Sequence, residues 1–318
     1  MIQTNNIRIS LDRREPDSDM DFVSHAHTDH LGAVRSSKGI LASDQTMELI
    51  EQAHGITIQN RAACGNFRML DAGHMLGSRQ LYIDDAVSGQ RIIYTGDFQT
   101  VRSKTSSPIE IAETDVLIMD STYYDSCVKF DDKYEVESAI QDWTMEKLKH
   151  GIVLFSAYAM GKAQELIAVF NDAGIKPLVS RKISKVSKIY TRNGINLDYS
   201  SVYDSDGDYD SIVKGNFVGI TDSRNLEMLR VGIETAHNKQ AYTAMATGFA
   251  KMFRFHTDAQ FPLSDHADFR QSVEYIESTK AKKVLTYGPN ASCFAANLSK
   301  EGYDAAPFVS ASILQHAK

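Results

Sequence analysis

The stretch that decides the fold is His25-Ala26-His27-Thr28-Asp29-His30, which follows the apolar residues Phe22-Val23 and leads into Leu31-Gly32-Ala33. It places four potential metal ligands within six residues. Four such side chains cannot all lie on one face of a helix or strand, so they must sit on a turn and converge on more than one ion. Imidazole and carboxylate groups together suit zinc or a related first-row metal. The stretch therefore predicts a metal centre at the end of a strand.

The rest of the chain has an α/β pattern, in which short apolar runs end in Gly, Asp or Ser and are followed by helical periodicity. In such proteins the chemistry usually lies at the C-terminal ends of the strands. We find no internal repeat and no low-complexity tract. Predicted strands end at Phe22-Val23-Ser24, Ile92–Asp97, Val116–Asp120, Ile152–Phe155 and Val284–Tyr287.

Composition limits the classes of protein to consider. The 318 residues, 42% of them hydrophobic, suffice for one large domain or two ordinary ones. No apolar run is long enough to span a bilayer, and the N-terminus lacks a signal-peptide pattern. Three distant cysteines suit a reducing cytoplasm, where we expect this chain. The net charge of −7 argues against a protein that coats nucleic acid non-specifically. It does not exclude a nuclease, because a cleft can be locally basic and bound metal adds positive charge.

The ordered H-x-H-x-D-H pattern resembles the signature of the metallo-β-lactamase superfamily, and further elements of that signature follow in order. Asp12 ends the run Ile9-Ser10-Leu11-Asp12, His74 lies in Gly73-His74-Met75-Leu76-Gly77-Ser78, and Asp97 lies in Tyr94-Thr95-Gly96-Asp97-Phe98. The resemblance implies an α/β fold, a four-layer αββα sandwich. It also implies a ligand set: His25, His27 and His74 for a first metal, Asp97 as the bridge, Asp29 and His30 for a second metal, and Asp12 as the acceptor that orients a ligand histidine.

Three other segments resemble the β-CASP nucleases, which process RNA or repair DNA. Asp120-Ser121-Thr122-Tyr123 is similar to their motif A, Phe261–Asp268 to motif B, and Tyr158–Leu166 to the G-[KR]-x-Q-E-L turn of their inserted domain. The likeness covers nearly the whole chain and is nearest to compact archaeal-type messenger-RNA 3′-end-processing-factor-like exonucleases. It implies a metallo-β-lactamase domain from residues 1–122 and 263–318, and an inserted α/β β-CASP domain at residues 123–262.

One position departs from the family pattern. Motif C of the RNA-processing branch has a histidine before glycine that binds the second metal, and here Tyr287 precedes Gly288. A neutral phenol is a poor zinc ligand beside imidazole, so the second site loses one donor. The DNA-repair branch, which is Artemis-like, also lacks that histidine. Tyr287 therefore leaves open whether two ions bind and whether RNA or DNA is cut.

The resemblance implies metal-dependent hydrolysis of phosphodiester bonds, with zinc as one or two ions or manganese in the weaker site. Asp29 and Asp97 serve catalysis as metal ligands, and His266, oriented by Asp120, contacts the phosphate or protonates the leaving oxygen. Lys162 and the helix start that it precedes are predicted to bind another phosphate. Ser264 of motif B is a further candidate substrate contact.

A basic segment adds candidate substrate contacts. From Lys176 to Leu197 there are six basic residues and no acidic one. Arg181, Lys185, Lys188 and Arg192 recur at helical spacing, with Ile183, Val186 and Tyr190 on another face. Alone this pattern indicates a solvated helix. Beside a nuclease motif, Arg181 and Lys185 become candidates for binding the substrate backbone.

Other hypotheses about function compete with that of a nuclease of single-stranded RNA or DNA. An Artemis-like DNA-repair enzyme and a non-catalytic β-CASP partner subunit both accommodate Tyr287, whereas a small-molecule hydrolase needs no insert of this size. The aspartate-rich segment with Asp198, Asp204, Asp206, Asp208 and Asp210 is not a calcium loop, because Gly207 is misplaced and no closing glutamate follows. The sequence does not distinguish exo from endo cleavage. We expect no membrane partner, and a homodimer only by family analogy.

Overall fold

The protein was analysed as a computed structural model, which describes residues 1–318 apart from 5–6, 37, 87, 202–208, 224 and 310–318. The acidic positions 204, 206 and 208 and the terminal His316 lie outside the described residues. The chain forms two compact units. Unit 1 comprises residues 1–102, 106–129 and 266–318, and unit 2 comprises residues 103–105 and 130–265. Unit 2 is thus inserted in the sequence of unit 1.

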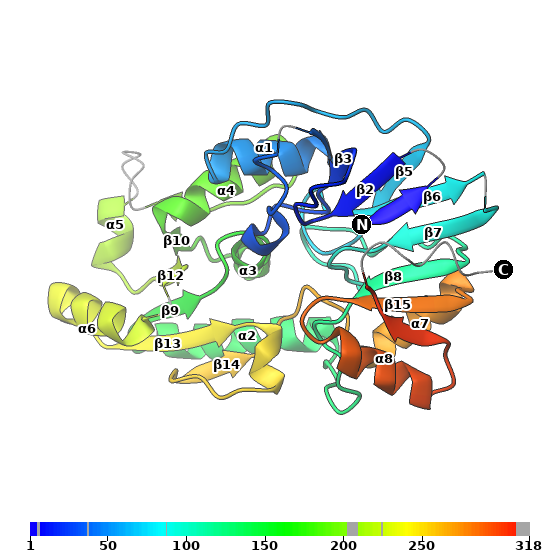
Figure 1. The fold of residues 1–318 in the computed structure, drawn as a ribbon. Coiled ribbons are helices and arrows are strands. Elements are labelled where there is room, and N and C mark those ends of the chain that lie inside the picture. Colours follow the sequence, from blue (N-terminus) through cyan, green and yellow to red (C-terminus); the bar gives the residue numbers. More distant parts are fainter. Residues whose placement is uncertain (5–6, 37, 87, 202–208, 224, 310–318) are drawn as a thin grey trace. The chain divides into compact units, whose positions relative to one another are not determined.

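Unit 1 contains two sheets (Figure 1). In the first, β1 pairs antiparallel with β2, and β2, β3 and β4 are parallel. In the second, of order β16-β15-β8-β7-β6-β5, the hairpins β5-β6 and β6-β7 are antiparallel and the other pairs are parallel. The strands are β1 Ile2–Thr4, β2 Ile7–Leu11, β3 Met20–Phe22, β4 Gly39–Leu41, β5 Phe67–Asp71, β6 Arg79–Asp85, β7 Gln90–Tyr94, β8 Val116–Asp120, β15 Lys283–Tyr287 and β16 Ala305–Pro307.

The core of unit 1 lies on both faces of its larger sheet. Ile9, Phe22 and Leu41 of the smaller sheet pack against Leu81, Ile118 and other apolar side chains of the larger sheet. On the opposite face, Leu117 and its neighbours pack against Phe269 and Phe294 of two helices. The helices and turns of this unit are η1 Thr28–His30, α1 Asp44–Ala53, α7 Phe269–Thr279 and α8 Ala291–Lys300.

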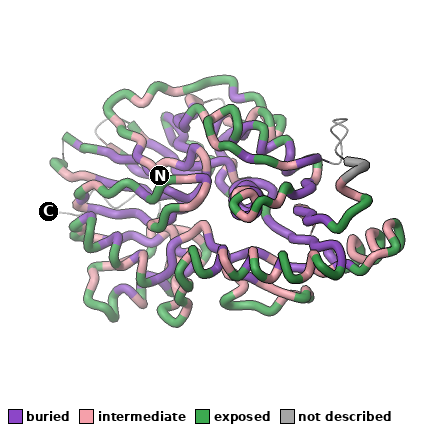
Figure 2. Tube along the Cα trace, turned by 180° about the vertical axis from the view of Figure 1, so that it is seen from behind, coloured by how far each residue is buried: buried purple, intermediate pink, exposed green. Residues whose placement is uncertain are grey.

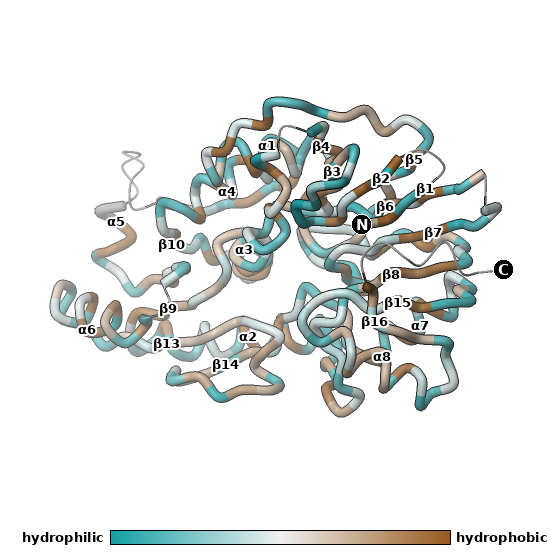
Figure 3. The backbone as a smooth tube through the Cα atoms, viewed as in Figure 1, coloured by the Kyte–Doolittle hydropathy of each residue, from teal (hydrophilic) through white to brown (hydrophobic). Residues whose placement is uncertain are grey.

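Unit 2 is built on a six-stranded parallel sheet of order β11-β10-β12-β9-β13-β14. Its strands are mostly buried, as Figure 2 shows in purple, and β9, which begins with four apolar residues, lies toward the hydrophobic end of the colour scale in Figure 3. The strands are β9 Ile152–Ser156, β10 Leu178–Val179, β11 Ser200–Ser201, β12 Val218–Thr221, β13 Ala241–Ala246 and β14 Ala259–Phe261.

Helices cover both faces of this parallel sheet. On one face Leu226 and Leu229 of α6 pack against Ile152 and Leu154 of β9. On the other, Trp143 and Phe170 contact the ring of Phe155 at centroid distances of 5.9 and 5.2 Å. The helices are α2 Lys133–Leu148, α3 Lys162–Asp172, α4 Arg181–Arg192, α5 Tyr209–Lys214, α6 Leu226–His237 and η2 Gly248–Lys251.

The predicted fold class is confirmed: the protein is an α/β metallo-β-lactamase-type αββα sandwich with an inserted α/β domain. The helix predicted from the basic segment is present as α4, with Ile183, Val186 and Tyr190 buried. The boundaries between compact units fall at residues 129/130 and 265/266, whereas the predicted domain limits of 122 and 263 stay predictions. Among the described residues, no helix combines the length and the apolarity needed to cross a membrane.

Candidate metal centre

Two glycines shape the turns that carry the candidate metal ligands of unit 1. Gly73, which precedes His74, has φ +78°, and a Cβ there would lie 2.3 Å from the Gln99 carbonyl oxygen. Gly96, which precedes Asp97, has φ +56°, and a Cβ there would lie 2.5 Å from the Ser24 side chain. Only glycine fits both the left-handed backbone and the close approach. The glycine of each motif therefore lets the next side chain turn toward a common centre.

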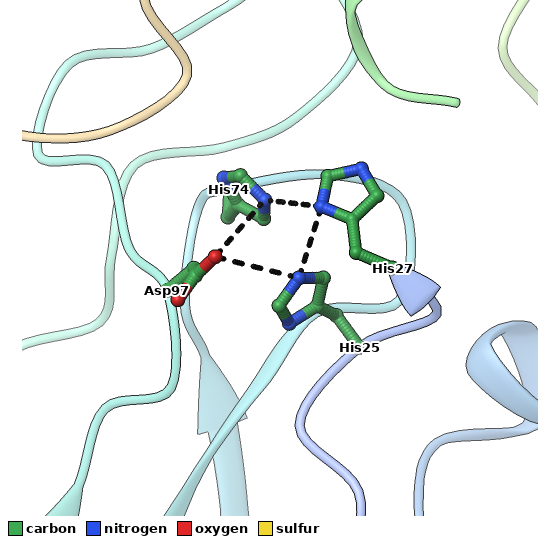
Figure 4. A group of neighbouring side chains, drawn as sticks. All are labelled: His25, His27, His74 and Asp97. Atoms are coloured by element: carbon green, nitrogen blue, oxygen red, sulfur yellow. Dashed lines mark hydrogen bonds and ion pairs between the residues drawn. The ribbon is translucent and has the colours of Figure 1, made fainter. Parts of the chain in front are cut away.

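Four side chains meet at that centre (Figure 4). His27 Nδ1 lies 3.0 Å from His25 Nε2 and 3.1 Å from His74 Nε2. Asp97 Oδ2 lies 3.6 Å from His25 Nε2 and 3.8 Å from His74 Nε2. His25, His74 and Asp97 are buried, and His27 is half-buried. The donor atoms come from three separate loops, which follow β3, β5 and β7.

The hydrogen bonds behind the rings assign the tautomer of His25. Ser24 Oγ donates its proton to Asp12 Oδ2 at 2.7 Å, so the same oxygen must accept from His25 Nδ1 at 3.0 Å. His25 is then protonated at Nδ1, and its Nε2 presents a lone pair to the centre. A lone pair at this position, next to other imidazole nitrogens and a carboxylate, is available to a cation.

The donor set fits a divalent first-row metal. With metal–nitrogen bonds of 2.0–2.1 Å, two donors of a tetrahedral site lie about 3.3 Å apart. The four donor–donor distances given above, from 3.0 to 3.8 Å, bracket that value. Three imidazoles and one carboxylate are also ligands that such ions prefer. His25, His27, His74 and Asp97 therefore form one preassembled site.

A second group of donors is centred on His30. Asp12 Oδ2 accepts from His30 Nδ1 at 2.8 Å, so Nε2 is again the atom left for a metal. That nitrogen lies 3.4 Å from Asp97 Oδ2 and 3.7 Å from Asp29 Oδ2. The Asp29 side chain is 82% exposed. Among the described residues this trio is not one of the groups whose donors all lie within 4.8 Å, so the second site is the more open one.

Asp12 is the anchor of the whole arrangement. The buried carboxylate accepts from the Ser24 amide at 2.7 Å, from the Tyr94 hydroxyl at 2.7 Å and from His30, in addition to the Ser24 hydroxyl. Its backbone has φ +56°, a strained conformation for a non-glycine residue that surrounding structure must enforce. The contact to a ligand histidine is the one predicted for Asp12, whereas Ser24 and Tyr94 were not predicted.

The two carboxylates of this centre, Asp12 and Asp97, favour a positive charge in it, which is a proton on His30 or, in its place, a metal ion. Burial alone would lower the pKa of His30, but Asp97 and Asp12 outweigh it and hold that pKa well above its usual range. Burial likewise opposes ionisation of Asp97, yet His30 and His25 hold the pKa of that carboxyl well below its usual range. Burial and the charge of His30 lower the pKa of His25 well below normal, so His25 stays neutral and can act as a ligand.

His266 joins the centre from a distant part of the chain. The segment is fixed to unit 1 because Gln99 Nε2 donates to the His266 carbonyl at 2.8 Å and Ala267 N donates to Phe98 O at 2.9 Å. His266 Nδ1 lies 3.2 Å from Asp120 Oδ2, and its Nε2 lies 3.9 Å from Asp97 Oδ2. Burial and the charge of Asp97 raise the pKa of Asp120. The pair places one imidazole nitrogen beside the metal donors.

Tyr287 occupies the motif C position without supplying a donor to the centre. Its hydroxyl donates to the Leu11 carbonyl at 3.0 Å, next to Asp12. Its ring packs edge-on against Tyr94 with centroids 5.4 Å apart, and the Arg13 guanidinium lies 4.8 Å above it. Burial raises the pKa of the Tyr287 phenol. The side chain therefore buttresses the strand that carries Asp12.

The predicted substrate contacts of unit 2 divide into buried and exposed ones. Lys162 is 1% exposed, and its Nζ lies 3.5 Å from both Glu165 Oε2 and Asp265 Oδ1. The ammonium therefore lies inside unit 2 between two carboxylates, and the prediction that Lys162 contacts substrate phosphate stays a prediction. Ser264 is buried too, and its carbonyl accepts from a lysine, Lys133, at 3.4 Å.

The remaining candidates lie on the surface of α4. Arg181 and Lys185 are exposed, as are Lys188 and Arg192 on the same helix. Their role in substrate binding stays a prediction. The helix start at Lys162 is also partly used internally, because the Gly161 amide donates to Gln164 Oε1 at 2.8 Å.

Several known proteins are similar in sequence to this chain. No protein-family model matches the chain. A probable DNA ligase of Opitutus terrae is 29% identical over 89% of this chain and 28% of its own length. An RNase J-like protein of Methanocaldococcus jannaschii is 30% identical over 48% of this chain and 44% of its own. Cleavage and polyadenylation specificity factor subunit 3 of Dictyostelium discoideum is 24% identical over 51% and 26%.

This chain thus spans between about a quarter and a half of the length of those relatives. An αββα sandwich with an imidazole and carboxylate centre at its strand ends defines the metallo-β-lactamase class of fold. Within that class, the chain belongs to the β-CASP nuclease family.

Proposed function

We propose that this protein is a metal-dependent nuclease that hydrolyses phosphodiester bonds of single-stranded nucleic acid. The observation that carries the proposal is the convergence of His25, His27, His74 and Asp97 with a fifth group, His266, which is not needed as a ligand of the first site. Zinc is the metal that this donor set suits best, with manganese as an alternative at the open site of Asp29 and His30. A metal bound there supplies Lewis-acid activation of water and neutralises charge on the phosphate.

The side chains of unit 1 have separate tasks in this proposal. His25 and His30 are held by Ser24 and Asp12 with Nε2 toward the centre, so the ligands need no rearrangement when metal binds. His266 holds a proton at Nδ1 toward Asp120 and presents Nε2 to the reacting phosphate. In its charged form, His266 donates a proton from Nε2 to the leaving oxygen.

The relatives differ on whether the substrate is RNA or DNA. Two of the relatives, the RNase J-like protein and cleavage and polyadenylation specificity factor subunit 3, have names that point to RNA. Another relative, which matches 89% of this chain, is a probable DNA ligase whose matched part is 28% of its length. RNA is therefore the first substrate to test, and DNA is tested beside it.

The deciding experiment is cleavage of end-labelled single-stranded RNA and DNA of the same sequence, with zinc or manganese. Metal-dependent cutting that disappears in Asp29→Ala supports the nuclease, and labels at either end give the polarity. The surface variant Asp84→Ala, on the exposed side of β6, is the matched control. Failure to cut either polymer with any metal would shift the assignment to a non-catalytic β-CASP subunit.

The role of His266 is tested separately. We expect His266→Gln to lower kcat by about a hundredfold to ten-thousandfold, the range of a lost general acid, without lowering metal content. Asp120→Asn should lower kcat less, because it disturbs only the orientation of the ring. Loss of bound metal in His266→Gln, measured by elemental analysis, would mean that His266 is a ligand instead.

A further inference from the structure

Unit 2 contains a cavity of about 580 Å³ that is lined only by its own residues. The volume lies within the range of sites that bind small molecules or single nucleotides. The cavity lies at the carboxyl ends of β9 and β13. These are neighbouring strands of the parallel sheet (Figure 1). Its lining is Ser156, Ala157, Tyr158, Ala159, Lys182, Asp222, Met245, Ala246, Thr247, Phe249, Phe253 and Phe255.

The topology explains why a cavity forms at this edge. From β9 the chain passes through α3 to β10 on one side of the sheet, whereas from β13 it passes to β14 on the other side. Loops that leave adjacent parallel strands in opposite directions open a crevice between them, and α/β proteins bind ligands in that crevice. The cavity therefore occupies the position where such a sheet offers a site.

The walls of the cavity are unusually aromatic for a surface hollow. Tyr158 is 52% exposed and Phe253 is 56% exposed. The ring of Phe249 lies 6.1 Å from that of Phe253, tilted by 38°. Large aromatic side chains left in water beside a hollow cost free energy unless a ligand covers them. Flat apolar faces of this kind suit a planar ring.

The rim of the cavity is polar and carries both signs of charge, with a further basic side chain nearby in the sequence. Lys182 is 66% exposed and lies 3.6 Å from Asp222, which also lines the cavity. Arg254 alternates with Phe253 and Phe255 in the sequence, and its side chain is exposed. Lys182 also belongs to α4, the helix with the exposed basic face. Positive charge beside aromatic faces is the combination that binds single-stranded nucleic acid, whose phosphates and bases it matches.

We propose that this cavity binds one nucleotide of a single-stranded nucleic acid, with the base stacked against Phe253 and Tyr158 and a phosphate near Lys182. The Asp222 carboxylate offers an acceptor for an exocyclic amino group of the base. The inference rests on the proposed nuclease function, which supplies the class of ligand. It adds a site on unit 2 that is separate in its residues from the metal centre of unit 1.

The test measures binding without cleavage. The wild-type protein in EDTA is titrated into a fluorescein-labelled single strand of about 12 nucleotides, RNA or DNA, at fixed salt, and anisotropy gives the Kd. Phe253→Ala and Tyr158→Ala should each raise the Kd roughly five- to a hundredfold, the range for one lost stacking partner. Phe253→Leu should behave like Phe253→Ala, because leucine keeps the apolar volume but offers no flat face. Lys182→Ala should weaken binding and reduce its salt dependence.

Matched controls lie elsewhere on unit 2. Tyr134 is 77% exposed and does not line the cavity, so Tyr134→Ala should leave the Kd unchanged. Lys149, on the surface at the end of α2, is the corresponding control for Lys182. A strand that carries 2-aminopurine should be quenched by the wild type and less by Phe253→Leu, which reports stacking directly.

Each result decides the inference. Cavity variants that bind the strand within twofold of Tyr134→Ala would overturn it. Saturable binding of free AMP that the cavity variants abolish, with strand binding unchanged, would also overturn it and assign the cavity to a free nucleotide. Cleavage by the wild type is measured independently of binding. If the wild type cuts and the cavity variants have an unchanged Kd, this inference is refuted and the proposed function stands. A protein that binds through the cavity but never cuts refutes only the nuclease.

Discussion

Each unit of this protein buries charged side chains, but the two buried clusters are built in opposite ways. In unit 1 the ring nitrogens of His25, His27 and His74 face one another and Asp97, between 3.0 and 3.8 Å apart. In unit 2 ammonium and carboxylate groups alternate, with Lys133 bonded to Glu165 at 2.7 Å. The pairs in that second cluster are Lys104–Glu137, Lys133–Glu165, Lys162–Glu165 and Lys162–Asp265.

The difference separates a site from a scaffold. A cluster whose charges alternate is neutralised largely from within. A cluster whose ring nitrogens and carboxylate converge is stabilised by a cation among them. Convergence, more than burial or the presence of charge, marks the place where an ion belongs.

The strongest way to break this comparison is Asp97→Ala. The substitution removes the carboxylate that faces both groups of donors, so we expect cleavage to fall by at least about a thousandfold and bound metal to fall with it. EDTA should lower the Tm of the wild type and hardly change that of the variant, since bound metal stabilises only the protein that holds it. Full metal content in Asp97→Ala, by elemental analysis, would place the ion elsewhere.

The convergent cluster could be predicted from the sequence because its ligands lie in short, ordered motifs. His25 to His30 span six residues, and Gly73 and Gly96 directly precede the other two ligands. Asp12 carried less information, since one aspartate at a strand end has many uses. Its partner Tyr94 lies 82 residues away, and no local pattern connects the two. Contacts that depend on which strands become neighbours need the folded chain.

The alternating cluster is the part that the sequence did not predict. Gly161-Lys162 resembles a phosphate-binding helix start, and nothing local shows that the ammonium turns inward to Glu165 and Asp265. Burial is a property of the packed unit, in which α2 and α3 bring their charges together. The basic face of α4 was easier, because exposure of Arg181 and Lys185 follows from the burial of Ile183 and Val186 at helical spacing.

Lys162→Ala is the matching test for unit 2. It leaves Asp265 with one counter-charge fewer and Glu165 with Lys133 alone, so we expect the free energy of unfolding to fall by about 3–5 kcal/mol. Metal content should not change. Urea unfolding measures the first and elemental analysis the second, with the surface variant Lys149→Ala as control. If Lys162→Ala bound a nucleic-acid strand more weakly without losing free energy of unfolding, the result would support the prediction that Lys162 contacts phosphate.

Asp12→Asn sharpens the comparison from inside the metal centre. Asparagine tolerates the left-handed backbone at this position, so the fold should survive. However, Tyr94 and His30 both donate to the Oδ2 atom of Asp12. If the amide nitrogen of asparagine takes that position, it faces two donors and neither of them has an acceptor. We expect metal affinity to fall about 10–100-fold, as measured by competition with a chelating dye. An unchanged affinity would show that the orientation of His30 does not depend on Asp12.

Tyr287 gives the smallest expected effect and the finest distinction between site and scaffold. Tyr287→Phe keeps the ring against Tyr94 and removes only the bond to the Leu11 carbonyl, which is buried. The free energy of unfolding should fall by about 1 kcal/mol, and cleavage should stay within about threefold.

Tyr287→His loses the same bond but adds an imidazole at the motif C position, where the family pattern described above predicts a histidine. If the open site of Asp29 and His30 lacks only that donor, the histidine variant should bind more of the second metal and cut faster than the phenylalanine variant, at similar stability. Equal metal content in the two variants would mean that the position is scaffold, and that the open site is completed from another side.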